Sequence, residues 1–209
     1  MKNTLQENMF QEVRNKEIFN QVQEYSFNYL ENIFERNVFP TQEAIDNLSI
    51  FDEELPVNST EAESVIKQLH QFGNPATTAT LGGRYFGFVC GSALPVGLAA
   101  KNLGTYWDQA PAMNVLSPIG SKLESVVEKW LVELFNFPTN TSAGFVSGTS
   151  TANLCGLAAA RYRILQRNNW DINKNGLRNA PKIRIVTGKQ AHSTVLKAIG
   201  TLGLGQDSI

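Results

Sequence analysis

The stretch FVSGTSTANL at residues 145–154 decides the fold, because it places a small, hydroxyl-rich turn between an apolar run and a helical pattern. It predicts a strand over 144–147 and a helix over about 150–166. The same order recurs downstream, with a strand expected over 183–187 and a helix over 193–199. Short strands that alternate with helices indicate an α/β fold, in which a mostly parallel sheet is covered by helices.

Upstream of this stretch the pattern is helical. Apolar residues at helical spacing predict an amphipathic helix from about 15 to 36, and a further helix is expected around 94–107. Two segments, Thr60–Glu63 and Ser121–Glu124, have the spacing of capping boxes and predict two more helix starts. We therefore expect a helical amino-terminal arm and linker over 1–58, followed by the first part of a large domain over 59–209.

The composition is that of a soluble globular chain. Of 209 residues, 42% are hydrophobic and 18% are charged, which excludes disordered and collagen-like classes. The formal net charge of -1 predicts neither nucleic acid nor an anionic membrane as a partner. Cys90 and Cys155 lie in apolar stretches without metal-ligand spacing, so we expect buried thiols and a reducing, cytoplasmic location.

Two places could carry chemistry. Free N–H groups at a helix start, together with the hydroxyls of Thr149 and Ser150, can form a cradle for an anion such as a phosphate, although the same residue types also serve as simple helix caps. His192 follows the second expected strand, so it could open onto the same crevice at the carboxyl ends of the strands, or be structural. His70 lies off its helix's apolar stripe and is expected to be a solvated surface histidine.

Other loop signatures fit less well. The chain contains no G-x-x-x-x-G-K-[ST] motif, and the segment 203–208 has two of the three glycines of a dinucleotide fingerprint. Residues 148–152 are similar to a nucleophile elbow, which would make Ser150 the nucleophile of an α/β-hydrolase. Such a triad would have to draw on His192 with Asp171 or Asp207.

In combination, several segments resemble the pyridoxal-phosphate-dependent group II amino acid decarboxylases, which include the aromatic-amino-acid and glutamate decarboxylases. The resemblance is carried by GTSTANL at 148–154 with AAAR at 158–161, and by AHSTVLKA at 191–198. The segments RYFGFV at 84–89 and SPIGSKLE at 117–124 are similar to further family segments. The resemblance covers about 61–209, and it implies the start of a fold-type I large domain.

The resemblance also implies roles for residues. Thr149 and Ser150 would hold the phosphate of pyridoxal 5'-phosphate, Gly148 would let the backbone approach it, and His192 would stack on the pyridine ring. A further segment would contact the substrate side chain, often across the interface of a homodimer: Tyr85, Phe86, Phe88 and Val89. The amino-terminal helix similarly suggests an arm that clasps a partner subunit.

The implied activity is decarboxylation of an L-amino acid to the amine and CO2. In the family, the Schiff-base lysine directly follows a histidine and lies far downstream, as does the aspartate that pairs with the pyridine nitrogen. Neither His70 nor His192 is followed by lysine, and Lys189 and Lys197 do not match the family's site. We therefore expect the first part of a longer protein, active only with its downstream region. The alternatives are a truncated, non-catalytic family member and the Ser150 hydrolase.

Overall fold

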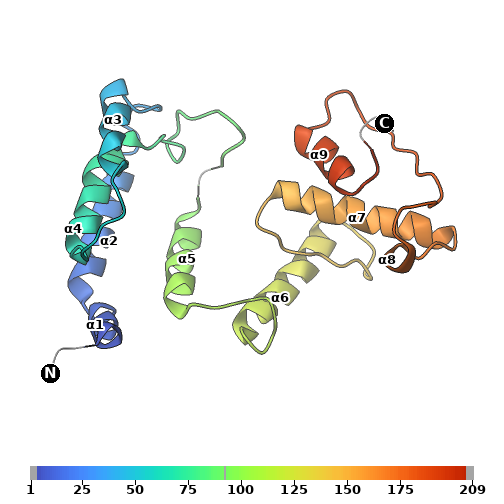
Figure 1. Ribbon diagram of the computed structural model, residues 1–209, viewed down its shortest axis with the longest axis horizontal. Coiled ribbons are helices and arrows are strands. Elements are labelled where there is room, and N and C mark those ends of the chain that lie inside the picture. Colours follow the sequence, from blue (N-terminus) through green and yellow to red (C-terminus); the bar gives the residue numbers. More distant parts are fainter. Residues whose placement is uncertain (1–3, 92, 206–209) are drawn as a thin grey trace. The chain divides into compact units, whose positions relative to one another are not determined.

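The computed structural model describes residues 4–91 and 93–205 (Figure 1). The chain divides into two compact units, Met1–Trp107 and Asp108–Ile209, and each is described by itself. The boundary expected after residue 58 lies inside the first unit. The division into an arm and a large domain stays a prediction.

The first unit is helical. Its α-helices are α1 (Leu5–Glu12), α2 (Lys16–Glu31), α3 (Gln42–Asp46), α4 (Ala62–Gln68) and α5 (Pro95–Trp107), with 3-10 turns at Asn47–Phe51 and Asn74–Ala76 and a π-helical turn at Leu69–Gly73. Asn15 caps α2, since its Oδ1 accepts from the Glu17 N–H at 3.0 Å. The predicted arm helix is thus confirmed, although it ends at Glu31 rather than near 36.

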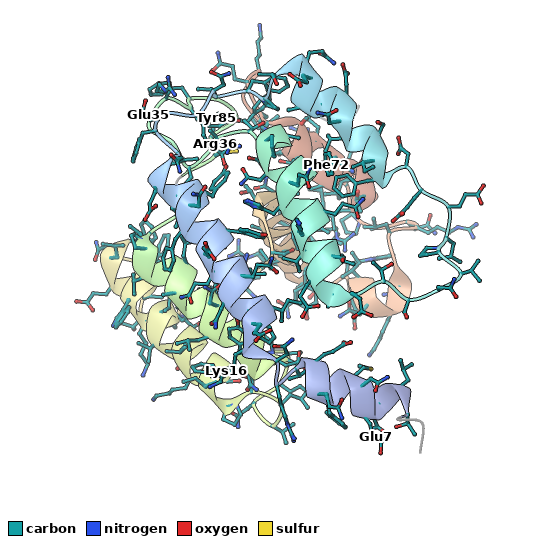
Figure 2. All side chains as sticks on the ribbon, turned by 90° about the vertical axis from the view of Figure 1, so that its left-hand side faces the viewer. Glu7, Lys16, Glu35, Arg36, Phe72 and Tyr85 are labelled. Atoms are coloured by element: carbon teal, nitrogen blue, oxygen red, sulfur yellow. The ribbon has the colours of Figure 1, made fainter. Side chains whose placement is uncertain are left out.

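The end of α2 is fastened to the segments that follow it. Arg36 donates to the side-chain and backbone oxygens of Asn74 at 2.7 and 2.6 Å, and its guanidinium lies 4.7 Å from the centre of the Tyr29 ring. Arg84 in turn donates to the backbone oxygens of Phe34 and Arg36. In Figure 2, Arg36 and Tyr85 are labelled in this region, beyond the carboxyl end of α2. The bonds of Arg84 hold the start of the segment 84–90 against the residues that follow α2.

His70 is not the solvated histidine that the sequence predicts. Its ring is half-buried and stacks on Tyr25 of α2, with ring centroids 3.6 Å apart and planes 5° apart. Its Nδ1 also lies 3.3 Å from Nδ2 of Asn74. The reason is the π-helical turn after α4, because this turn departs from the α-helical spacing on which the prediction relied.

The second unit contains α6 (Pro118–Leu134), α7 (Thr149–Arg167), α8 (Ile172–Asn175) and α9 (Ser193–Thr201). α6 begins three residues before the predicted capping box, because the buried Ser117 caps it by accepting from the Gly120 N–H at 3.2 Å, with Pro118 at the first helical position. The other predicted box is also wrong, since α4 begins after Glu61 without a side-chain cap.

The core of the second unit lies between α7 and α9, which pack against each other (Figure 1). Leu165 of α7 is fully buried and Ile199 of α9 is 1% exposed. Arg161 of α7 donates to the backbone oxygen of Leu202, just after α9, at 2.6 Å. This packing fixes the orientation of the two helices, and therefore of their amino ends.

Neither of the two predicted strands is formed. Residues 144–147 and 183–187 have irregular backbone, and the described ranges contain no strand. A strand needs a neighbour for its N–H and C=O groups, and two short parallel segments make a weak pair without further strands. The sheet therefore stays a prediction.

Much apolar surface is uncovered. The accessible surface is 17313 Å². A compact protein of this mass would expose about 9,700 Å², and even two separate compact halves would expose about 11,600 Å². Phe86, Phe88 and Val89 are all more than nine-tenths exposed. Cys90 and Cys155 are exposed as well, so the predicted burial of the thiols is wrong: the apolar stretches in which they lie are not covered.

Candidate functional site

The amino end of α7 is open. Its N-cap residue, Gly148, has extended backbone and gives no side-chain cap. Within the described residues, the N–H groups of Thr149, Ser150 and Thr151 and the side chains of these residues have no hydrogen-bond partner, and all three residues are exposed. Such N–H groups, at the positive end of the helix dipole, can bind an anion.

Gly148 leaves room for that anion. A Cβ atom added there would meet nothing within 4 Å. The protein's own packing therefore does not require glycine at this position, and the space beside the backbone is open to a ligand.

The amino end of α9 is closed by a histidine. His192 is the N-cap residue, and its Nδ1 accepts from the Thr194 N–H at 3.2 Å. The same nitrogen lies 2.9 Å from Oγ1 of Thr194. Because Nδ1 is an acceptor here, the neutral ring carries its proton on Nε2. The rest of the ring is exposed.

One hydrogen bond joins the two helix ends. Nδ2 of Asn153, in the second turn of α7, donates to Oγ1 of Thr194 at 3.1 Å. The structure thus brings His192 to the amino end of α7, where Thr149 and Ser150 lie. The sequence analysis did not single out Asn153 or Thr194. The available signal was that Asn153 stands four residues after Thr149 and so shares its helix face.

The predicted substrate segment belongs to the first unit. Phe88 and Val89 have φ angles of 52° and 55°, which a β-branched valine rarely adopts. The pKa of the Tyr85 phenol is raised above its ordinary 10.0, mainly by partial burial and to a smaller extent by the neighbouring Cys90 thiol. Tyr85, Phe86, Phe88 and Val89 belong to the first unit, whereas His192 belongs to the second.

The hydrolase triad is not assembled. In such a triad the acid accepts from Nδ1 of the histidine, but Nδ1 of His192 is already an acceptor for Thr194. Asp171 instead caps α8, with Oδ1 accepting from the Asn173 N–H at 3.0 Å. Asp207 lies outside the described residues. The geometry therefore argues against Ser150 as an activated nucleophile.

The other features of the second unit are less suited to chemistry. A shallow hollow of about 240 Å³ lies between the acidic side of α6 and residues 143–145. Glu128 on its wall already accepts from the Ala143 N–H at 2.8 Å. None of the predicted site residues lines this hollow. The described part of the chain has no cluster of three or more side chains that could hold a metal ion.

The chain resembles plant decarboxylases in sequence. It is 28% identical over 158 residues to tryptophan decarboxylase TDC2 of Camptotheca acuminata, a match that covers 73% of this chain and 30% of that protein. It is 25% identical over 162 residues to L-tyrosine/L-DOPA decarboxylase 2 of Lophophora williamsii, covering 75% of this chain and 30% of the relative. The chain thus spans about 30% of the length of these relatives. No protein-family model matches it.

Solved structures share its fold. Mouse CSAD in apo form superposes with a TM-score of 0.82 at 21% identity, covering 94% of this chain and 41% of that one. Oryza sativa TDC with PLP and tryptamine gives a TM-score of 0.79 at 19% identity, covering 93% and 40%. The predicted resemblance to the amino-terminal part of the group II decarboxylases is therefore confirmed. Among the described residues, no helix combines the length and the apolar character that crossing a membrane requires.

Proposed function

We propose that this chain forms the phosphate-binding and ring-stacking part of an enzyme that uses pyridoxal 5'-phosphate to convert an L-amino acid to the amine and CO2. The observation that carries the proposal is the uncapped amino end of α7 beside the imidazole of His192. The similarity to tryptophan and tyrosine decarboxylases over most of the chain supports it.

The residues present suit the two ends of this cofactor. A phosphate needs several donors and a positive potential, and the amino end of α7 offers three N–H groups, three hydroxyls and the helix dipole. A flat heteroaromatic ring needs a flat surface, and the exposed imidazole of His192 offers one. Gly148 leaves open the space that the phosphate would enter.

Each residue then has a separate task. Thr149 and Ser150 bind the phosphate and hold it at the start of α7. His192 limits the tilt of the ring and so helps to orient the bond to the carboxylate that must break. When bound, the cofactor supplies the conjugated ring that accepts the electron pair left as CO2 departs.

The imine-forming lysine is proposed to come from a part of the protein beyond this chain. Neither histidine is followed by lysine, and Lys197 stands in the middle of α9. Full activity thus requires the rest of the enzyme. The alternative is a non-catalytic relative that keeps the phosphate site alone.

Aromatic L-amino acids are the first substrates to test, because the relatives are named for tryptophan and tyrosine and because Tyr85, Phe86 and Phe88 offer an aromatic surface. We also propose a homodimer in the cytoplasm. In such a dimer, the exposed apolar side chains of the first unit would be covered by the partner subunit.

Binding of a phosphate-bearing ring tests the proposal on this chain alone. Pyridoxine 5'-phosphate has no aldehyde and cannot react with surface lysines, so equilibrium dialysis measures only the binding site. We expect it to bind more tightly than pyridoxine. Removing one hydroxyl that bonds a charged group costs about 1.5–3 kcal/mol, so Ser150→Ala should weaken binding roughly tenfold or more.

Ser142→Ala is the matched control, because Ser142 is also exposed but lies before the start of α7. It should leave the dissociation constant unchanged. Equal binding of pyridoxine and its phosphate, or the same constant in Ser150→Ala as in the wild-type chain, would contradict the proposal.

A further inference from the structure

We propose that Asn153 and Thr194 are positioning residues that fix the tautomer and the plane of the His192 ring. Their effect on the cofactor rests on the function proposed above, but the hydrogen-bonded geometry does not. Two hydrogen bonds connect three side chains in series, from Asn153 to Thr194 and from Thr194 to His192.

The direction of each hydrogen bond follows from the donors available. Nδ2 of Asn153 can only donate, so Oγ1 of Thr194 accepts from it at 3.1 Å. The threonine hydroxyl then has its one proton left to give, and Nδ1 of His192 is 2.9 Å away. The Thr194 N–H also points to this nitrogen, at 3.2 Å. Two donors therefore converge on Nδ1.

A proton on Nδ1 would face both of these donors. The neutral ring is therefore held in the form that carries its proton on Nε2. Because both donors belong to Thr194, they also fix one edge of the ring and restrict its rotation. Thr194 is itself half-buried, whereas His192 is exposed, so the ring is oriented by the better-packed residue.

Asn153 connects this arrangement to the phosphate-binding end of α7. The packing of α9 on α7 sets the direction of the two helices, but the segment before His192 gives the ring little support, since Val186 is 95% exposed. The hydrogen bond from Asn153 to Thr194 connects the ring to α7, the helix that carries Thr149 and Ser150. The two ends of a rigid cofactor would then meet groups on two packed helices whose amino ends are joined by this hydrogen bond.

The ring nitrogens of His192 can be observed directly, because the chain contains only two histidines. Long-range proton–nitrogen NMR spectra, recorded at about pH 8, distinguish protonated from unprotonated ring nitrogens. In the wild-type chain, we expect Nδ1 of His192 to be unprotonated and Nε2 to carry the proton. No cofactor is needed for this measurement.

Two variants should change that signature. Thr194→Val removes the hydroxyl at similar size, and the spectrum should shift toward a mixture of tautomers. Asn153→Asp keeps the shape of the side chain but replaces the donor with an acceptor. The Thr194 hydroxyl would then donate to the new carboxylate rather than to Nδ1, so the Nδ1-protonated form should increase.

Matched controls identify effects that are only structural. Thr201→Val alters a threonine of the same helix whose hydroxyl bonds to the Lys197 oxygen at 2.9 Å, and it should leave the His192 signals in place. The His70 signals belong to the first unit and should not move in any variant. Circular dichroism confirms that each variant keeps its helices.

The link to the cofactor is then measured by dialysis with pyridoxine 5'-phosphate. Loss of an ordinary hydrogen bond corresponds to roughly a 2- to 10-fold change in an equilibrium constant, so Thr194→Val should weaken binding by about that factor. Unchanged tautomers in both variants, or unchanged binding despite altered tautomers, would overturn the positioning role. If the wild-type protein does not bind pyridoxine 5'-phosphate at all, the proposed function fails. The NMR spectra test the hydrogen bonds among Asn153, Thr194 and His192 independently of that result.

Discussion

Leu165→Ala should destabilise the second unit more than any equivalent change on its surface. Leu165 is fully buried in α7 and belongs to the core shared with Ile199 of α9. Truncating a buried leucine costs about 2–5 kcal/mol, because apolar contacts are lost and a cavity remains. Alanine is a strong helix former, so the loss would come from packing rather than from helix propensity.

Urea unfolding followed by tryptophan fluorescence measures this loss. Trp170 is a suitable reporter, because its N–H bonds to the Leu165 oxygen at 2.9 Å and its ring nitrogen bonds to the Gly176 oxygen at 2.8 Å. Replacing Trp107 and Trp130 with phenylalanine leaves Trp170 as the only tryptophan.

Leu134→Ala is the matched control. Leu134 lies at the end of α6 and is 74% exposed, so its truncation should change the free energy of unfolding by less than about 0.5 kcal/mol. Similar losses in the two variants would refute the assignment of Leu165 to the core. If Leu165→Ala does not fold, Leu165→Met conserves volume and should cost less than about 1.5 kcal/mol.

Two further predictions concern local features. Ser117→Ala removes the buried cap of α6 and should lower the free energy of unfolding by about 1 kcal/mol; an unchanged urea midpoint would show that this hydroxyl is not the cap. Cys90→Ala should lower the pKa of Tyr85 toward 10.0, as followed by NMR titration of its ring. Because the pKa of Tyr85 is raised on folding, its contribution to the free energy of unfolding is present below pH 10.0 and is lost as the pH rises through the pKa of the folded protein. The same Tyr85 titration curve in Cys90→Ala and in the wild-type protein would contradict the role of the Cys90 thiol.

The helices could be predicted from the sequence because their signal is local. The helices expected around 94–107, 150–166 and 193–199 agree with α5, α7 and α9 to within two residues at each end. The start of α6 was wrong because two serines four residues apart, Ser117 and Ser121, both suit a cap, and burial of the first one decides between them. Local pattern carries no information on that burial.

Strand formation and the burial of the cysteines depend on contacts with residues distant in the sequence, which a local pattern does not show. Neither 144–147 nor 183–187 finds a neighbouring strand in the described residues, and Cys155 has no covering layer. At the site, His192 and the small, hydroxyl-rich residues at the start of α7 could be recognised from the sequence, because their residue types suit a phosphate and an aromatic ring. The bond from Asn153 to Thr194 was not, because it joins residues 41 positions apart whose side chains have no distinctive local pattern.

The π-helical turn at Leu69–Gly73 makes the first unit sensitive to changes in chain length. A π-turn holds more residues than an α-turn, and each residue of an α-helix advances the side-chain direction by about 100°. Deleting the exposed Gln71 would let the turn close as an ordinary α-helix and would rotate His70 relative to Asn74. A single-codon deletion at this point would therefore disturb the stack on Tyr25 without altering either ring, so homologues one residue shorter here need a different pair of side chains to join these helices.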